Sequence, residues 1–129
     1  MSGTRIYLVL SALIWLPYGL FCVFQPETLA DIAGVVGTTP TGTTEIRAMY
    51  GGLQAGIGVI CVLALMRPDF ARSALITLCC LAGGLFLARF SGFLIDGSGS
   101  QYTYGALVFE STYALAAGYL ARGSTVSET

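Results

Sequence analysis

The 129-residue chain is 55% hydrophobic and only 10% charged, an apolar excess that a soluble domain of this length does not need. All six bases are dispersed arginines, so no basic stripe exists to follow a nucleic-acid backbone, and we expect no nucleic-acid partner. Histidine is absent, which removes a common metal ligand and the commonest general base, and we expect no metal and no cofactor.

The first half of the chain contains one apolar segment followed by a polar loop. Residues 6–24 are an unbroken apolar run of the ~20 residues that a membrane-spanning helix requires, and Pro17 lies within it. Residues 25–44 are polar and end in a Thr-rich run without periodicity, which predicts a loop outside the membrane. Within this loop, residues 26–32 place Leu29 and Ile32 on one face, which favours a short surface helix.

Three further apolar segments follow, at residues 45–66, 73–96 and about 104–121. Pro68 interrupts the first connection, so the two segments around it form an antiparallel hairpin. A Gly/Ser turn at residues 97–101 makes the second connection. The sequence therefore predicts an all-α integral membrane protein, an antiparallel four-helix bundle that forms one domain over residues 1–129.

The arginines predict how this bundle is oriented. Four of the six arginines lie in the connections and tails on one side of a four-span arrangement, namely Arg5, Arg67, Arg72 and Arg122. The two loops of the opposite side contain neither arginine nor lysine. Under the positive-inside rule both termini are cytoplasmic, and the protein is expected in the inner (plasma) membrane.

Small residues predict where the helices touch, because membrane helices associate through close approach of their backbones. In the second segment Gly52 and Gly56 form a GxxxG pair, and Gly51 and Gly58 flank it. In the third segment a small-residue cluster is expected to do the same, namely Ala82, Gly83 and Gly84. The four cysteines fall in apolar runs without metal-binding or redox spacing, which indicates packing residues.

Five ionisable residues lie in or at the ends of the predicted spans, namely Glu45, Arg47, Arg89, Asp96 and Glu110. A charge in mid-bilayer costs ~2.5–3.5 kcal/mol on insertion scales, so such residues normally face the bundle interior and pair. At 1.5 Å per residue, Arg89 lies ~10 Å below Asp96, and Glu110 lies ~9 Å below the start of its span. The sequence therefore predicts that Arg89 and Glu110 lie at the same depth in the outer half of the membrane.

The helical repeat also groups polar residues on shared faces. One face of the second span carries Arg47, Tyr50 and Gln54, and one face of the fourth carries Glu110 and Tyr113. Two interpretations follow. In the first, the charges are structural: Glu110 pairs with Arg89, and Glu45 or Asp96 pairs with Arg47.

In the second interpretation, the charges form a pocket that opens to the outer side. The three acids outnumber the two arginines, so one acid is left without a partner. This acid, for which Glu110 is the candidate, keeps its proton and donates it. Asp96 or Glu45 is the second carboxylate, and Tyr50 relays a proton. Arg89 and Arg47 orient the carboxylates or a substrate oxygen. The substrate is expected to be walled by other polar and aromatic side chains, namely Trp15, Tyr18, Gln54, Phe93 and Tyr113.

The run at residues 45–56, with Glu45, Arg47, Tyr50 and two adjacent glycines, resembles the signature of a bacterial family known only as domain of unknown function 4345. Arg89 before Asp96-Gly97, and Glu110 early in the last segment, also resemble that family's pattern. The family is similar in layout to DoxX-like four-helix membrane proteins, some of which are associated with quinone or thiosulfate oxidation. The resemblance implies that these residues belong to one set, without naming an activity.

Two functions remain open from the sequence. One is a membrane-embedded acid/base enzyme acting on a lipophilic small molecule, such as an isomerase, a terpenoid-type cyclase or an epoxide-opening enzyme. The other is a non-catalytic lipid-binding, transport or accessory subunit, in which case a homo-oligomer or a membrane partner is expected. Redox work by the adjacent pair Cys79 and Cys80 is disfavoured, because their side chains diverge by ~100° on a helix.

Overall fold

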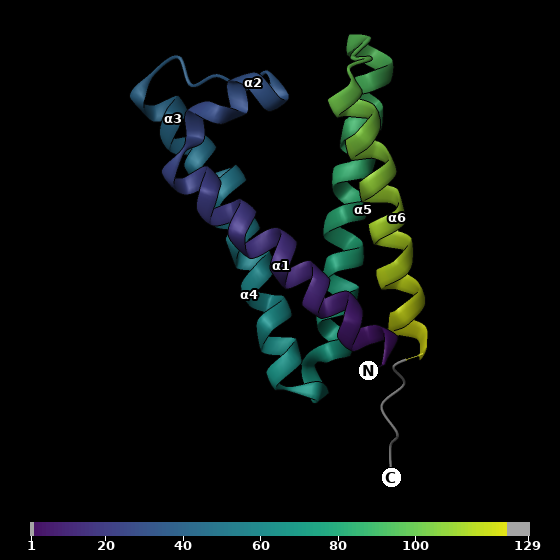
Figure 1. The fold of residues 1–129 in the computed structure, drawn as a ribbon. Helices are drawn as coiled ribbons and strands as arrows, with labels where there is room; N and C mark the ends of the chain where they lie inside the picture. Colours follow the sequence, from purple (N-terminus) through teal and green to yellow (C-terminus); the bar gives the residue numbers. More distant parts are fainter. Residues whose placement is uncertain (1, 124–129) are drawn as a thin grey trace. The chain divides into compact units, whose positions relative to one another are not determined.

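A computed structural model describes residues 2–123, and every regular element in that range is helical, as the sequence predicts (Figure 1). The helices form two compact units, one ending at Pro68 and the other beginning at Asp69. Each unit is built around a pair of helices that lie side by side. The prediction of one domain stays a prediction.

The first unit pairs α1 with a long helix that changes its winding. α1 spans Gly3–Phe24, and the hydroxyl of its N-cap Ser2 accepts a hydrogen bond from the Arg5 amide at 3.3 Å. The partner helix consists of α3 (Pro40–Ile46), the π-helical turn η2 (Arg47–Gly52) and α4 (Leu53–Met66). α1 packs along η2 and α4.

Glycines hold the backbones of this pair close together. Three contacts set a glycine of one helix against the other: Gly19 with Ala55, Gly51 with Val23, and Gly58 with Leu16. A Cβ at any of these glycines would overlap the facing helix. This is the close approach typical of membrane helices.

Within the first unit, the predicted GxxxG pair does not form the contact between α1 and α4. Gly56 has nothing within 4 Å of where a Cβ would stand, and Gly52 has only its own helix's Arg47 carbonyl oxygen, at 3.9 Å. Gly51 and Ala55 satisfy the same small-xxx-small spacing on the neighbouring face, and that face also carries Gly58. Spacing alone does not decide between the two faces. Gly83 and Gly84 are likewise open, and Ala82 is the buried member of its cluster.

The connection between α1 and α3 contains the short helix that the sequence predicts, as η1 (Pro26–Thr28) followed by α2 (Leu29–Ala33). Leu29 is buried in a cluster with Cys22 and Ile46, which ties α2 to the ends of α1 and α3. The left-handed backbone of Gly34, with φ +69°, ends α2.

The predicted loop is too long at its C-terminal end, because α3 begins at Pro40 rather than at residue 45. Thr39 is the N-cap, and its hydroxyl oxygen accepts from the Gly42 amide at 3.0 Å. A Thr-Pro pair is a favourable helix start, since Pro at the first helical position has no amide to satisfy. The sequence prediction relied on hydrophobic periodicity, which this segment lacks, and therefore missed the start of the helix.

The second unit is a hairpin of two long helices. The 3₁₀ turn η3 (Pro68–Phe70) leads into α5 (Ala71–Asp96), which packs along α6 (Gln101–Gly123). Gly97 ends α5 in the left-handed region with φ +65°, and the Ser100 hydroxyl accepts from the Thr103 amide at 3.1 Å at the start of α6. α6 therefore begins three residues before the predicted position.

Within residues 2–123, three helical segments are long and apolar enough to cross a membrane: Gly3–Phe24, Pro40–Met66 and Pro68–Asp96. They contain the first three predicted spans. α6 has 23 residues but is not among the three, and it carries Glu110 together with several hydroxyl side chains. A fourth span stays a prediction.

Candidate functional site

An ion pair between α5 and α6 is the central polar feature of the second unit. The Arg89 Nε donates to Oε1 and Oε2 of Glu110 at 3.0 and 3.1 Å, and Nη2 donates to Oε1 at 2.8 Å. Both carboxylate oxygens therefore accept from the guanidinium, as in the strongest class of charged hydrogen bonds. The predicted pairing is confirmed, and the depth of the two residues in a membrane stays a prediction.

The two partners differ in how well they are shielded. The Glu110 side chain is 6% exposed, whereas that of Arg89 is 27% exposed. The Arg89 Cζ also lies 5.5 Å from the centre of the Tyr102 ring, within cation–π range. The guanidinium thus covers the carboxylate and is itself covered on one side by an aromatic ring.

Other aromatic side chains line the same hairpin. Tyr113 is buried and stacks on Phe109 at 5.4 Å between ring centres. Phe93 packs edge-on against Tyr104 at 5.7 Å. Phe93 and Tyr113, both predicted as substrate walls, therefore belong to the aromatic packing of α5 and α6.

Asp96 does not join the ion pair. It is the exposed last residue of α5, seven residues and ~10 Å along the helix from Arg89. Across residues 2–123, the structure records no ion pair for Asp96. It stands at the end of the helix rather than beside Glu110.

In the first unit, the π-helical turn η2 places Arg47 at the end of α1. The Arg47 Nη1 donates to the Val23 carbonyl, one of the last carbonyls of α1 that lack a helical partner. The expected pairing of Arg47 with Glu45 is not formed, and Glu45 is exposed. Arg47 satisfies a backbone acceptor instead of a carboxylate.

The π-turn also separates side chains that the sequence placed on one face. A π-turn adds a residue to the helical repeat, which rotates the following side chains by ~100° relative to an uninterrupted α-helix. Arg47 is accordingly exposed, Tyr50 half-buried and Gln54 buried. The single face of Arg47, Tyr50 and Gln54 was therefore wrong, because it assumed 3.6 residues per turn throughout.

The remaining predicted wall residues lie inside the first unit. Tyr18 and Tyr50 pack against the cluster of Cys22, Leu29 and Ile46. Trp15 is buried at 8% exposure. The buried Oε1 of Gln54 has no hydrogen-bond partner among the described residues, which is a costly state for an amide oxygen and marks a position for a donor from a ligand or water.

Sequence reasoning missed two participants, Tyr102 and the Val23 carbonyl. Tyr102 lies between the predicted turn and the predicted fourth segment, although Ser100 is a favoured N-cap residue that indicates an earlier start of α6. The Val23 carbonyl belongs to the backbone, so no side-chain pattern marks it. Residues 2–123 contain no group of three Cys, Asp or Glu side chains that could hold a metal ion.

A family model described as Domain of unknown function (DUF4345) matches residues 3–121. The chain belongs to this family. The match covers both helical units, the π-turn and the Arg89–Glu110 pair, and so confirms the resemblance seen at residues 45–56. No curated protein and no solved structure matches the chain.

Proposed function

We propose that this DUF4345 protein is a membrane-embedded acid/base enzyme that acts on a lipophilic small molecule, with the Glu110 carboxylate as its proton acceptor. The observation that carries the proposal is the buried Glu110 in a hairpin that is otherwise largely apolar. A carboxylate in such surroundings is expensive, and intramembrane ionisable residues typically serve a function. Arg89 offsets that cost by three hydrogen bonds.

The geometry favours one reaction type among the three that the sequence left open. A terpenoid-type cyclase that starts by protonation needs a neutral acid, whereas a carboxylate that is ion-paired with a guanidinium has no proton to donate and can act only as a proton acceptor. An isomerase needs only a base that removes a proton from one carbon of the substrate and returns it to another. We therefore assign proton-transfer isomerisation to Glu110, with Arg89 stabilising negative charge that develops on a substrate oxygen.

The other predicted site residues keep narrower roles in the proposal. Gln54, with its unpaired amide oxygen, is the candidate to bind a donor group of the ligand in the first unit. Tyr50, Trp15 and Tyr18 contribute apolar surface there. Catalytic roles for Asp96, Glu45 and Arg47 stay predictions: Asp96 stands apart from the Arg89–Glu110 pair at the end of α5, and Glu45 and Arg47 belong to the first unit.

The proposal includes four membrane crossings with both termini in the cytoplasm, in the inner membrane. Three apolar helices support it, and so does the surface of α6, which exposes large side chains that suit lipid contact, namely Val108, Leu115 and Tyr119. An ionisable residue that is paired inside the hairpin, as Glu110 is with Arg89, is compatible with a helix that crosses the membrane.

The test compares membranes that contain the wild-type protein with membranes that contain Glu110→Gln. Lipid extracts are profiled by chromatography and mass spectrometry for isomeric pairs of lipophilic compounds. We expect at least one isomeric pair whose ratio changes with time in membranes that contain the wild-type protein. In membranes that contain Glu110→Gln the same ratio should change at least ~100-fold more slowly, which is the loss typical of a missing general base. Asp31→Asn, which neutralises an exposed acid of α2, is the control and should behave as the wild type.

A second function has its own supporting observation. Both oxygens of Glu110 are engaged by Arg89, as expected of a structural ion pair in a non-catalytic lipid-binding, transport or accessory subunit. That function predicts identical lipid profiles for wild type and Glu110→Gln at equal amounts of folded protein. Such a result would reject the enzyme.

A further inference from the structure

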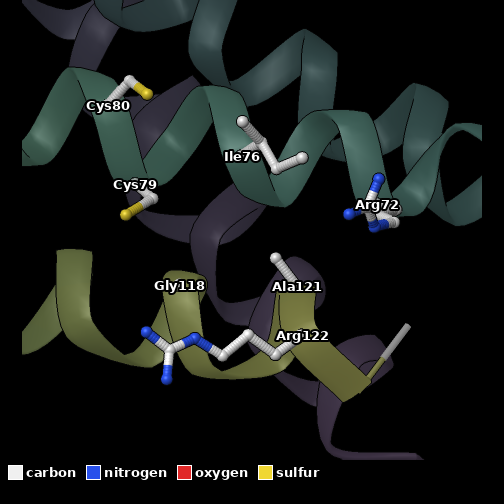
Figure 2. A pocket seen from close by; sticks show the side chains of 7 residues that line it. All are labelled: Arg72, Ile76, Cys79, Cys80, Gly118, Ala121 and Arg122. Atoms are coloured by element: carbon white, nitrogen blue, oxygen red, sulfur yellow. The ribbon is translucent and has the colours of Figure 1, made fainter. Parts of the chain in front are cut away.

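The second unit has another polar feature at the opposite end of the hairpin. A cavity of about 230 Å³ lies between α5 and α6, and Figure 2 shows the residues that line it, namely Arg72, Ile76, Cys79, Cys80, Gly118, Ala121 and Arg122. Arg72 comes from the first turn of α5 and Arg122 from the last turn of α6. Because the helices are antiparallel, both arginines line the same pocket, although Figure 2 shows the Arg122 side chain extending toward Gly118 and away from Arg72.

This cavity is separate from the Arg89–Glu110 pair. Arg72 precedes Arg89 by 17 residues on the same helix, which is ~25 Å at 1.5 Å per residue. Arg122 follows Glu110 by 12 residues on α6, or ~18 Å. An occupant of the cavity therefore lies at the other end of the unit from the proposed catalytic carboxylate.

The charge of the cavity is uncompensated by the residues that line it. None of them is acidic, and the structure records no ion pair for Arg72 or Arg122 with any residue from 2 to 123. Asp69 lies three residues before Arg72 but does not line the cavity. Two guanidiniums without a carboxylate attract an anion, and their planar donor groups match the oxygens of a phosphate.

The rest of the lining is apolar and open. Figure 2 shows Arg122 reaching back along α6 toward Gly118, while Cys79 faces α6 from α5. A Cβ at Gly118 would lie 3.2 Å from the Cys79 Sγ, which is tighter than an ordinary contact, so the glycine lets α6 pass close to the Cys79 side chain. Ile76 is 42% exposed and continues the apolar surface along α5.

We infer that this pocket binds an anionic phospholipid, with its head group attracted by Arg72 and Arg122 and an acyl chain beside Ile76 and Cys79. A soluble anion would use the arginines alone. The apolar part of the lining, on a helix apolar enough to cross a membrane, favours a ligand that has both a phosphate and a hydrocarbon chain. The inference does not depend on the chemistry of Glu110.

The test measures lipid retention by the purified full-length protein in detergent, using native mass spectrometry with dioleoylphosphatidylglycerol and dioleoylphosphatidylcholine. We expect the wild type to prefer the anionic lipid, and the double variant Arg72→Gln/Arg122→Gln to bind it about 30-fold more weakly. Arg72→Lys/Arg122→Lys should keep most of the binding because it keeps both charges. Arg5→Gln is the matched control, since it removes an arginine outside the cavity and should change nothing.

A steric variant and a competitor complete the test. Gly118→Leu keeps both arginines but fills the cavity, and it should weaken binding while the protein still elutes as a single species in size-exclusion chromatography. Excess inorganic phosphate should leave the bound lipid in place. Three results would each overturn the inference: equal retention of the two lipids, an equal loss in Arg5→Gln, or displacement of the lipid by phosphate alone, which indicates a site for free anions.

Discussion

The difference in exposure between Arg89 and Glu110 makes the two residues unequal in their effect on stability. Glu110 is 6% exposed and depends on Arg89 for its hydrogen bonds, whereas Arg89 is 27% exposed and keeps the Tyr102 ring when Glu110 is changed. Removing the guanidinium therefore leaves a buried charge without compensation. Removing the carboxylate leaves a cation that keeps its contact with the Tyr102 ring.

We predict that Arg89→Gln destabilises the protein by about 3 kcal/mol and that Glu110→Gln costs about 1 kcal/mol. Thermal unfolding of each single variant and of the double variant in detergent gives the coupling between the two side chains. The double variant should be more stable than Arg89→Gln alone, because it no longer contains a buried unpaired carboxylate. Equal losses in the two single variants would contradict this asymmetry.

For individual residues, the sequence predicted the Arg89–Glu110 pair but not the groups around it. The spacing of Arg89 and Glu110 from their helix ends placed them at one level of the hairpin, and they pair there because α5 and α6 are regular. Tyr102 and the Arg47 hydrogen bond to Val23 were missed, since both depend on where a helix begins or ends. Helix ends are set by capping, which the apolar periodicity does not register.

Among the elements, the packing of α1 on α4 depends on which glycines face the partner. Gly19 stands against the Ala55 backbone, so an added methyl group has no flexible side chain to displace. Gly56 has open space around it. The two positions are a matched pair for testing the contact face.

We predict that Gly19→Ala destabilises the first unit by about 1–3 kcal/mol, the usual cost of overpacking. Gly56→Ala should be neutral or stabilising by up to about 1 kcal/mol, because alanine favours the helix over glycine. The midpoint of thermal unfolding in detergent measures both. A loss at Gly56→Ala that matches Gly19→Ala would show that the contact face has been misassigned.

The π-turn shows where element prediction from sequence stops. The sequence predicts one apolar span at residues 45–66, and the structure has a continuous helical course over residues 40–66. The change of winding at Arg47–Gly52 leaves no mark in the apolar pattern, because two adjacent glycines permit several backbone paths without requiring any.

For the whole molecule, the number of membrane crossings decides where the C-terminus lies. Four crossings put both termini on one side, whereas crossing by the three most apolar segments alone would put them on opposite sides. We predict that a fluorescent protein fused after residue 129 is active, as expected in the cytoplasm, and that alkaline phosphatase fused there is inactive. Fusions at Arg67 and at Gly99 serve as cytoplasmic and external references. Active phosphatase at the C-terminus would show that α6 does not cross.

The most direct measurement of the central claim is the lipid profile of membranes that contain the charge-swapped variant R89E/E110R. The swap preserves an ion pair between α5 and α6, so a purely structural pair predicts the wild-type profile. The proposed enzyme predicts a folded protein whose profile matches that of Glu110→Gln, because the carboxylate no longer stands on α6. A wild-type profile from the folded, swapped protein would contradict the assignment of Glu110 as the catalytic base.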